Sequence, residues 1–465
     1  MLYLRMYRAD IPRARHATFT VLKQRAGERL RALLGPTTET QARIVGVAPE
    51  ALEQGRPPMR DVYGQSRVID GELYTDGQAI VLMSLSETRQ RAVLRPRRVE
   101  PVGGTVAASE PPPLRLDIYF IGPSSDSDAV GEILGVAQDI LGVAPERYSW
   151  SSRQLNELRD EGREPPAPPS ENELAAARLL RDRSVRMLTI AIKASGGLLV
   201  RDLPKQVSSD ETRNIGELTE LLKGARLVDS EIVVVCSKTQ AQVTRAPNRD
   251  VLAELSARRI RCACGRPIAD ERIEEALTVT DLGRALLDKA RWLTVLLVEQ
   301  LEAVGVSRDD ILVEQNVGGD EIDCLANISG ELALFELKDK EFNLGNAYSF
   351  GAKIGIIRPA HSVIFTTEQV GNDAKEHFVR ARKAGGPRDF DDESEEPGSR
   401  EIVYIEGVHN LQVGVEQLTG SINRIDAARL LDEVLPLASL SGATLLQAIE
   451  RGPALAAPKD ARGAA

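Results

Sequence analysis

The clearest alternation of apolar and polar positions in the chain lies in residues 319–338. Two apolar runs flank Ser329 and Gly330, which predicts two short strands joined by a turn. Residues two apart share one face of a strand. The second strand therefore directs Phe335 and Leu337 to one face, and the charged residues beside them project from the opposite face.

Charged side chains occupy unusual places in this predicted hairpin. Pairing Ile328 with Glu331 across the turn sets Asp323 against Glu336, with Lys338 nearby. Two carboxylates and an ammonium group at the rim of an apolar sheet are costly to desolvate. They are explained if they hold a divalent cation, since Mg²⁺ takes carboxylate oxygens and leaves sites open for water and phosphate. The pattern therefore indicates a metal-dependent phosphodiesterase.

The elements predicted around this hairpin follow a definite order. A helix-period segment, Leu282–Val304, comes first, and a strand, Ile311–Val317, follows it. Beyond the hairpin the sequence predicts a helix at Asn346–Ile356 and a strand at Ser362–Thr366. A second helix at Asn372–Lys383 and a last strand at Glu401–Ile405 follow.

The residues Asp323 and Glu336-Leu337-Lys338 resemble the Asp…Glu-x-Lys signature of the PD-(D/E)XK, or restriction-endonuclease-like, nucleases. The order of helix, three-strand meander, helix and strand is also what the core of that superfamily looks like. This resemblance covers residues 280–408 and implies a C-terminal restriction-endonuclease-like α/β core with a mixed central sheet. The alternative is a surface hairpin with an ordinary Glu–Lys pair, which contributes little to stability.

The same resemblance implies roles for the site residues. Asp323 and Glu336 would coordinate one or two Mg²⁺ (or Mn²⁺) ions, with the backbone carbonyl of Leu337 as a further ligand. Lys338 would orient the attacking water and offset the charge that builds on phosphorus. Lys340 could contact a neighbouring phosphate, although an ordinary surface lysine is the favoured interpretation.

One position departs from the pattern. Many relatives carry a glutamate on the first helix, about three turns before the closing glycine, and here the count back from Gly305 reaches Thr294. Asp320 and Glu321 flank the first strand of the hairpin and could reach the ion instead. The metal count and the fourth ligand stay open. The missing carboxylate also motivates an alternative, a catalytically inactive nucleic-acid-binding or regulatory protein that retains the nuclease fold.

The chain before this region predicts further elements. Between residues 114 and 205 we expect a strand at Leu116–Ile121 and a helix at Asp128–Leu141. A second helix at Glu171–Arg181 and a second strand at Arg186–Ile192 are expected to follow. The first strand and helix form a β-loop-α unit typical of α/β domains. The loop that opens at Gly122 lacks the glycine patterns of phosphate-binding loops, which excludes nucleotide hydrolysis.

Residues 206–275 predict a different kind of module. A helical segment that includes Ile215–Leu222 is followed by the apolar strand Glu231–Cys236. Helices followed by a strand hairpin resemble a winged helix-turn-helix, which binds DNA in some proteins and docks protein in others.

The cysteines need separate treatment. Cys262 and Cys264 lie in a turn that looks like half of a zinc knuckle, and Cys236 at a strand end could add a ligand. Structural zinc takes four ligands. No histidine lies nearby and Cys324 belongs to the predicted nuclease strand, so structural Zn²⁺ is the less favoured interpretation and buried, metal-free cysteines are the favoured one.

Length and composition indicate a soluble multidomain α/β protein. At 465 residues the chain suggests about three domains, and its hydrophobic fraction of 42% and charged fraction of 28% are ordinary. A stretch rich in Pro, Gly and Ser at 101–113 predicts a linker. Residues 1–105 are predicted to form an N-terminal α+β domain, and residues 114–205 an α/β domain that senses or docks. Residues 206–275 are predicted to form a winged-helix-like segment, residues 280–425 a nuclease domain and residues 426–465 a helical tail.

Charge and cysteine usage bear on the expected cellular location and on the expected binding partners. Four cysteines, no secretory signal and no apolar run of membrane-spanning length favour the cytoplasm and no membrane partner. A net charge of −10 argues against a general nucleic-acid-coating protein. Residues 1–100 nevertheless hold 17 basic against 11 acidic residues, and Arg89–Arg98 could neutralise phosphates. The acidic run Asp389–Glu396 is expected to be a solvated loop.

These observations predict the substrate and setting of the activity. We expect cleavage of DNA rather than RNA with little sequence preference, because the segment Asp339–Phe350 carries few basic groups that could read bases. Its Phe342, Tyr348 and Phe350 are expected in the core more than on unpaired bases. The upstream domains suggest a protein partner or an oligomer that controls cutting, and a role in bacterial defence against phage or plasmid DNA. A small-molecule enzyme in the N-terminal half is disfavoured because the four histidines lie in no recognisable motif.

Overall fold

The computed structural model divides into two compact units, one made of Met1–Ser151, Ile328–Gly330 and Glu416–Ala465, the other of Ser152–Asn327 and Glu331–Val415. No helix within the described residues combines the length and apolar character needed to cross a membrane. The basic patch 89–98, the linker 101–113 and the acidic run 389–396 lie outside these residues. The structure describes residues 2–11, 19–22, 24–25, 66–75, 79–88, 114–122, 128–148, 150, 152–161, 168–206, 215–317, 319–384, 401–434, 442–443 and 446–447.

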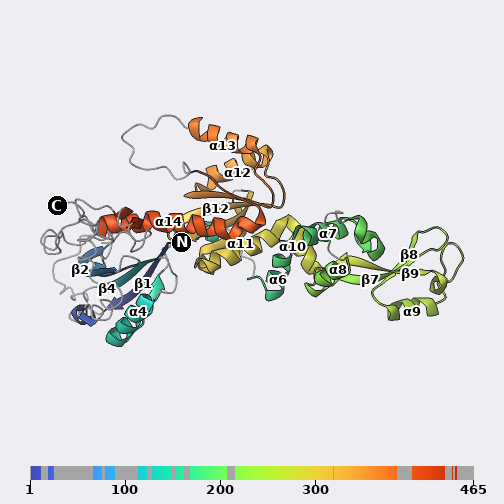
Figure 1. The fold of residues 1–465 in the computed structure, drawn as a ribbon, viewed down its shortest axis with the longest axis horizontal. Coiled ribbons are helices and arrows are strands. Elements are labelled where there is room, and N and C mark those ends of the chain that lie inside the picture. The colour runs from blue at the N-terminus through green and yellow to red at the C-terminus, as the bar shows by residue number, and fades with distance from the viewer. Residues whose placement is uncertain are drawn as a thin grey trace, which may run out of the picture. The chain divides into compact units, whose positions relative to one another are not determined.

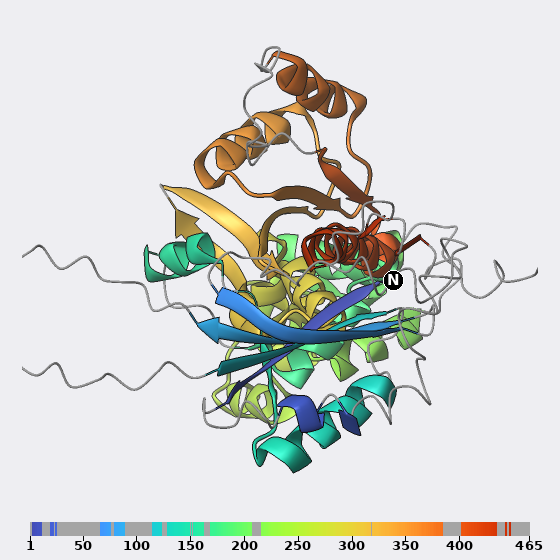
Figure 2. The ribbon, with the colours of Figure 1, turned by 90° about the vertical axis from the view of Figure 1, so that its left-hand side faces the viewer.

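The first unit contains a five-stranded sheet with the order β2-β3-β4-β1-β5 (Figure 2). Its paired strands run antiparallel. Because β1 and β3 both pair with β4, the predicted domains 1–105 and 114–205 contribute strands to one sheet. The predicted strand at Leu116–Ile121 is confirmed. The five strands are β1 (Tyr3–Ile11), β2 (Ser66–Thr75), β3 (Ile80–Thr88), β4 (Leu114–Gly122) and β5 (Glu146–Tyr148).

Both faces of this sheet are covered by helices. The predicted helix at Asp128–Leu141 is confirmed as α4, whose Ile133 and Ala137 pack with one apolar face of the strands. On the other face, Leu430 and Leu431 of α14 (Leu411–Val434) pack with apolar side chains of β1 and β3. A sheet covered on both sides must be apolar on both sides, and all residues of β4 except Arg115 are buried.

The second unit begins with helices. The predicted helix at Glu171–Arg181 is confirmed as α6 (Glu171–Leu179), where Ser170 and Glu173 form a capping box. It follows α5 (Arg153–Glu161) and precedes α7 (Arg183–Ala194).

The strand predicted at Arg186–Ile192 is wrong, because these residues belong to α7. The apolar run in this segment resembles a buried strand. Asp182 starts a helix instead, since its side chain accepts the backbone N–H groups of Ser184 and Val185. The residues that α7 then buries recur at helical spacing and include Val185, Leu188 and Ile192.

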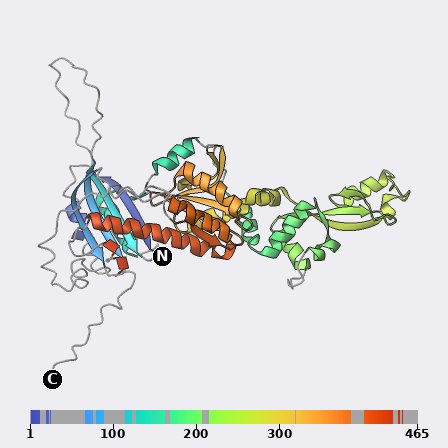
Figure 3. The same ribbon diagram turned by 90° about the horizontal axis from the view of Figure 1, so that it is seen from above.

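A four-stranded sheet with the order β6-β9-β7-β8 follows (Figure 3). The predicted strand at Glu231–Cys236 is confirmed in its essentials as β7, which pairs antiparallel with both β8 and β9. Helices α7 and α8 precede this hairpin, and the winged-helix resemblance of residues 206–275 stays a prediction. The elements are β6 (Leu198–Leu199), α8 (Ile215–Gly224), β7 (Val228–Val235), β8 (Gln242–Ala246), α9 (Arg249–Ala257) and β9 (Arg272–Val279).

The helix predicted at Leu282–Val304 is broken into α10 (Asp281–Leu287) and α11 (Arg291–Ala303). Lys289 and Ala290 between them take left-handed conformations, with φ values of 51° and 56°. The apolar period continues across the break, so sequence periodicity does not reveal it. The break turns Lys289 toward Glu321, whose carboxylate lies 2.7 Å from its Nζ.

The remaining sheet has the order β10-β11-β12-β13-β14, and it is mixed (Figure 1). β10 and β11 are antiparallel, whereas β12, β13 and β14 run parallel. The predicted α/β class and mixed C-terminal sheet are confirmed. Helices α12 and α13 lie together on this sheet, whose elements are β10 (Ile311–Val317), β11 (Asp320–Ile328), β12 (Glu331–Lys338), α12 (Leu344–Ile357), β13 (His361–Thr366), α13 (Asn372–Ala384) and β14 (Val403–Glu406).

Candidate metal centre and active site

The turn between β11 and β12 positions the candidate site. β11 ends at Ile328 and β12 begins at Glu331, as the sequence predicts. The two residues between them, Ser329 and Gly330, have φ values of 54° and 97°. Positive φ at both central residues is the geometry of a type I′ turn, which matches the twist of paired strands. A two-residue loop of this kind holds the strands in one register.

The hairpin brings the predicted site residues together. The backbone N–H of Leu337 donates a 2.7 Å hydrogen bond to Oδ2 of Asp323. Glu336 is only 2% exposed, and its Oε1 lies 2.8 Å from Nζ of Lys338. The Lys338 side chain is 29% exposed, so one end of the cluster reaches solvent. The side chain of Leu337 is buried, and its carbonyl stays a predicted ligand.

Sequence reasoning missed a second lysine in this cluster. Nζ of Lys353, on α12, lies 2.6 Å from Oε2 of Glu336, and the residue is almost fully buried. Glu336 is therefore held between two ammonium groups, one on each oxygen. The available signal was helical spacing, because Lys353 shares the buried face of α12 with Ala347, Phe350 and Ile357. A lysine on such an apolar face needs a buried anionic partner.

Burial and the neighbouring charge change the ionisation of Asp323. Burial, and after it the charge of the Glu336 carboxylate, raise the pKa of this carboxyl to about 6. The charge of Lys353 and the hydrogen bond from Leu337 oppose this rise. For Lys338, burial lowers the pKa, but the carboxylates of Glu336, Asp323 and Glu321 together outweigh burial and the net pKa is raised. Lys338 is therefore protonated at neutral pH.

Of the two flanking carboxylates, Glu321 is the one placed near the cluster. It shares a strand face with Asp323 and contributes to the raised pKa of Lys338. Its carboxylate also accepts both contacts from Lys289, at 2.7 and 2.9 Å. Asp320 begins β11 and pairs with Val317 of β10.

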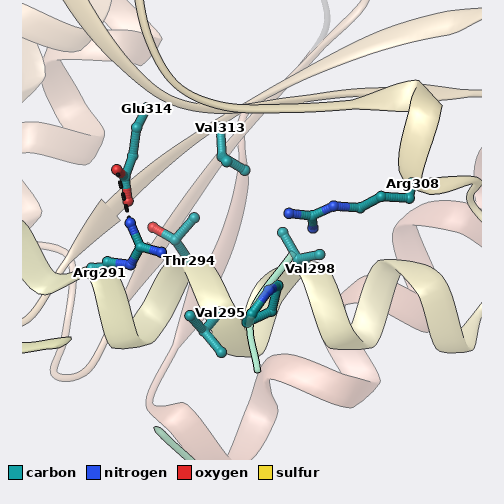
Figure 4. Close-up of a pocket in the computed structure, with 8 residues that line it drawn as sticks. Arg291, Thr294, Val295, Val298, Arg308, Val313 and Glu314 are labelled. Carbon is teal, nitrogen blue, oxygen red and sulfur yellow. Dashed lines mark ion pairs between the residues drawn. The ribbon is translucent and has the colours of Figure 1, made fainter. Parts of the chain in front are cut away.

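Thr294, the position that the count back from Gly305 reaches, lines a separate small pocket between α11 and β10 (Figure 4). There Nη1 of Arg291 lies 3.5 Å from Oε2 of Glu314. Val298 and Val313 supply apolar walls. The pocket volume of about 20 Å³ accommodates a water molecule or two and no nucleotide, so we do not assign chemistry to it.

A buried contact anchors the chain just after Lys338. Asp339 accepts a 3.0 Å hydrogen bond from Nε1 of Trp292 and lies 3.1 Å from Nε of Arg186. The guanidinium carbon of Arg186 lies 5.1 Å from the centre of the Trp292 ring. Burial raises the pKa of Asp339, and the charge of Arg186 opposes the rise. This triad ties the end of β12 to helices α7 and α11.

The segment beyond Asp339 divides into core and surface. Phe342 and Phe350 are fully buried and pack edge to face, which confirms the expectation that they belong to the core. The same expectation is wrong for Tyr348, which is 60% exposed and packs edge to face against His377. Lys340 is exposed.

The cysteines form a second cluster of potential metal ligands. Cys236, Cys262 and Cys264 lie with Glu271, and their ligand atoms are all within 4.8 Å of one another. Cys324 is buried in β11 next to Asp323. The sequence identified three of the four members, and Glu271 was missed because it follows the cysteines without a recognisable spacing.

No protein-family model and no curated protein matches the chain. The solved structures that are similar to parts of it include the following two. The crystal structure of protein VC1899 from Vibrio cholerae shares 13% identity at a TM-score of 0.27, over 58% of this chain and 57% of that chain. The crystal structure of a protein of unknown function, AF1548, shares 14% identity at a TM-score of 0.20, over 34% of this chain and 94% of that chain. These low TM-scores carry no argument about fold or function.

Proposed function

We propose that the C-terminal sheet carries a divalent-metal-dependent nuclease site that hydrolyses phosphodiester bonds. The observation that supports this most directly is the convergence of Asp323, Glu336 and Lys338 from two adjacent strands. The same residues carry the resemblance to the PD-(D/E)XK nucleases. In this proposal Asp323 and Glu336 bind the metal, and Lys338 acts on the substrate.

The donor atoms fit a hard divalent cation. Burial and the repulsion between two close carboxylates make ionised Asp323 costly, and a cation between them relieves both effects. Oδ1 of Asp323 accepts no hydrogen bond from the part of the chain that the structure describes, which leaves it available to a ligand. Carboxylate and carbonyl oxygens suit Mg²⁺ and Mn²⁺, so Asp323, Glu336 and the Leu337 carbonyl would hold one or two ions. A bound ion would polarise the scissile phosphate and lower the pKa of a bound water.

The two lysines have different tasks in this proposal. Lys338 is partly exposed and protonated, so its ammonium group orients the attacking water and stabilises charge that develops on the phosphate. Lys353 is buried against the other oxygen of Glu336. It acts as a positioning residue, because it fixes the orientation of that carboxylate without reaching the substrate.

DNA with little sequence preference is the proposed substrate. Phe342 and Phe350 are buried in the core and cannot stack on bases, and Lys340 is the exposed cation nearest to the site in sequence. Contacts of this kind read phosphate rather than base edges. Binding should therefore weaken strongly as the salt concentration rises.

Control by a partner is part of the proposal. The Asp339, Arg186 and Trp292 triad connects β12 with helices of the preceding module, so a partner bound there could act on the site. The proposed role is a regulated effector in bacterial defence against phage or plasmid DNA. Phage plating on cells that carry the gene in its operon tests it, with Glu336→Gln as the comparison. Equal plating on both strains would overturn a defence role that depends on cutting.

The test of the nuclease itself is cleavage by the purified chain. Linear DNA, circular DNA and RNA are incubated with Mg²⁺, with Mn²⁺ and with EDTA. We expect metal-dependent cleavage of DNA that Asp323→Ala, Glu336→Ala and Lys338→Ala abolish. Glu341→Ala is the matched control, because Glu341 is an exposed carboxylate near the site in sequence.

Two outcomes would contradict this assignment. Cleavage that persists in both Asp323→Ala and Glu336→Ala would place the chemistry elsewhere. Tight binding of DNA with no metal-dependent cutting would favour the alternative, a regulatory protein that keeps the fold without the reaction.

A further inference from the structure

Four potential ligands converge at one end of the β7–β8–β9 sheet. Cys236 follows β7, Cys262 and Cys264 lie in the loop after α9, and Glu271 immediately precedes β9. All four ligand atoms lie within 4.8 Å of one another. Three thiols and a carboxylate from three separate segments are thus gathered at one point.

Two tight turns present the thiols to this point. In the first, the N–H of Gln240 donates to the carbonyl of Cys236, and the N–H of Cys236 donates to the carbonyl of Ala241, at 2.9 and 2.8 Å. The N–H of Thr239 points at Sγ of Cys236, at 3.4 Å. An amide that donates to sulfur stabilises the thiolate rather than the thiol.

The second turn is one residue shorter and is also closed by two backbone hydrogen bonds. The N–H of Gly265 donates to the carbonyl of Cys262, and the N–H of Cys262 donates to the carbonyl of Arg266, both at 2.8 Å. Gly265 has a φ of 94°, a conformation that favours glycine. Its Cα atom would have open space for a side chain, so the backbone conformation and not crowding calls for glycine here. The turn places Cys262 and Cys264 on the same side.

Glu271 is the fourth potential ligand of the cluster, and it is a buried carboxylate. It is only 5% exposed, and its Oε2 accepts a 2.6 Å hydrogen bond from the N–H of Ser237. Its Oε1 accepts a 3.0 Å hydrogen bond from Sγ of Cys264. No ion pair to Glu271 occurs within the described residues. Hydrogen bonds reach both oxygens, but no cation among the described residues offsets the buried charge, and a metal ion would supply that cation.

The apolar cluster on the same face of the sheet as Cys236 is small. It consists of Val234, Ala246, Leu252 and Ile268, with four partly buried neighbours. Burying a side chain of this size contributes about 1.5 to 3 kcal/mol. Small modules of this kind commonly depend on a metal or a disulfide for stability.

We propose that Cys236, Cys262, Cys264 and Glu271 bind a structural Zn²⁺ ion. Zinc accepts thiolate and carboxylate ligands in tetrahedral geometry at about 2.3 Å and 2.0 to 2.2 Å, which separates sulfurs by about 3.8 Å. That spacing falls within the measured limit of the cluster. Binding would release the three thiol protons to solvent while the carboxylate binds as it is. Four protein ligands fill the tetrahedron, so the ion has a structural role and not a catalytic one.

Other occupants explain the cluster less well. Mg²⁺ and Ca²⁺ prefer oxygen ligands and do not suit three sulfurs. A disulfide would use two of the three cysteines and leave the buried Glu271 without a role. This inference concerns a different module from the proposed nuclease site, and its test uses no nucleic acid, so the two can fail separately.

The test is the metal content of the full-length chain purified without chelator, measured by inductively coupled plasma mass spectrometry. We expect one zinc ion per wild-type chain and none in the triple variant Cys236→Ser, Cys262→Ser, Cys264→Ser. Cys324→Ala is the matched control and should keep its zinc, because Cys324 lies in β11 away from the cluster. Glu271→Gln should release zinc to a competing chelator dye at a lower dye concentration than the wild type.

A second measurement covers the case in which the triple variant fails to fold. Wild-type protein reconstituted with Co²⁺ should show the intense visible bands of tetrahedral cobalt thiolate, and Cys264→Ser alone should weaken its sulfur charge-transfer band. Wild-type protein that contains no zinc and carries a disulfide between two of these cysteines would overturn the proposal. Iron in place of zinc, or zinc retained by the triple variant, would also overturn it.

Discussion

The backbone N–H of Leu337 donates a 2.7 Å hydrogen bond to Oδ2 of Asp323. The bond links the two strands that carry the candidate site, and it orients one carboxylate oxygen while leaving the other available. Because Leu337 stands between Glu336 and Lys338, the contact also holds the strand from which both charged side chains project. The local order of the strand therefore determines the geometry of all three groups.

The raised pKa of Asp323 predicts a pH dependence of stability. Its folded-state pKa of about 6 exceeds the ordinary value of 3.8, so the folded chain binds this proton more tightly than the unfolded chain does. The stability from this site is fully present below the ordinary pKa and is lost as pH rises through 6. Relative to Asp323→Asn, the wild type should lose on the order of 3 kcal/mol between pH 4 and pH 7.

Urea unfolding of both proteins at a series of pH values, without divalent cations, measures this difference. Using the difference between the two proteins cancels the titration of the other groups. A constant difference across the range would show that Asp323 keeps an ordinary pKa in the folded chain. Added Mg²⁺ should stabilise the wild type above pH 6 and should not stabilise Asp323→Asn.

The two lysines that contact Glu336 should respond differently to substitution. Lys353→Met leaves a buried carboxylate with one ammonium partner fewer, and we expect a loss of about 2 to 4 kcal/mol of unfolding free energy. Lys338→Met, at the more exposed end, should cost about 1 kcal/mol and abolish cleavage. Thermal unfolding and cleavage assays on both variants separate the two roles. Equal stability losses would contradict the distinction.

Much of the C-terminal sheet could be predicted because its apolar runs are short and bounded by turn residues. The Ser329–Gly330 turn is an example, since its position sets the spacing of both strands. The segment at Arg186–Ile192 was misread because its apolar run fits a strand as well as a helix. The N-terminal cap formed by Asp182 favours the helix, and the length of the apolar run does not reveal this cap.

The residues of the candidate sites likewise divide into those that the local sequence pattern predicts and those that it does not. Asp323, Glu336 and Lys338 belong to one hairpin, so the alternation of strand residues is enough to bring them together. Lys353 comes from a helix that packs on the sheet, and Glu271 joins the cysteines through the pairing of β9 with β7. Contacts of this kind depend on tertiary packing, which no local period encodes.

The triad at the end of β12 predicts a loss of both stability and activity. Trp292→Phe keeps the ring in the core and removes the 3.0 Å hydrogen bond to Asp339. A hydrogen bond to a charged group contributes about 1.5 to 3 kcal/mol. We expect a destabilisation in this range and a lower cleavage rate, because Asp339 directly follows Lys338 and holds the end of its strand.

Chemical unfolding gives the stability change, and the cleavage rate is compared under conditions where both proteins are folded. Trp150→Phe is the control, because it makes the same change to an indole that packs against the apolar core of the first unit. Full activity in folded Trp292→Phe would mean that the triad stabilises the chain without affecting the site.

Two glycines should give opposite results when replaced by alanine. Gly330 has a φ of 97°, and an added Cβ would lie 3.2 Å from Cβ of Trp150. Gly330→Ala should therefore cost about 1 to 2 kcal/mol and impair cleavage, because the turn sets the spacing of Asp323 and Glu336.

Gly355 lies within α12 and has open space around its Cα atom. Gly355→Ala should stabilise the chain by about 0.5 to 1 kcal/mol and leave cleavage unchanged, since alanine favours a helix more than glycine does. Differential scanning calorimetry measures both effects, and destabilisation by Gly355→Ala equal to that of Gly330→Ala would contradict the role assigned to the turn.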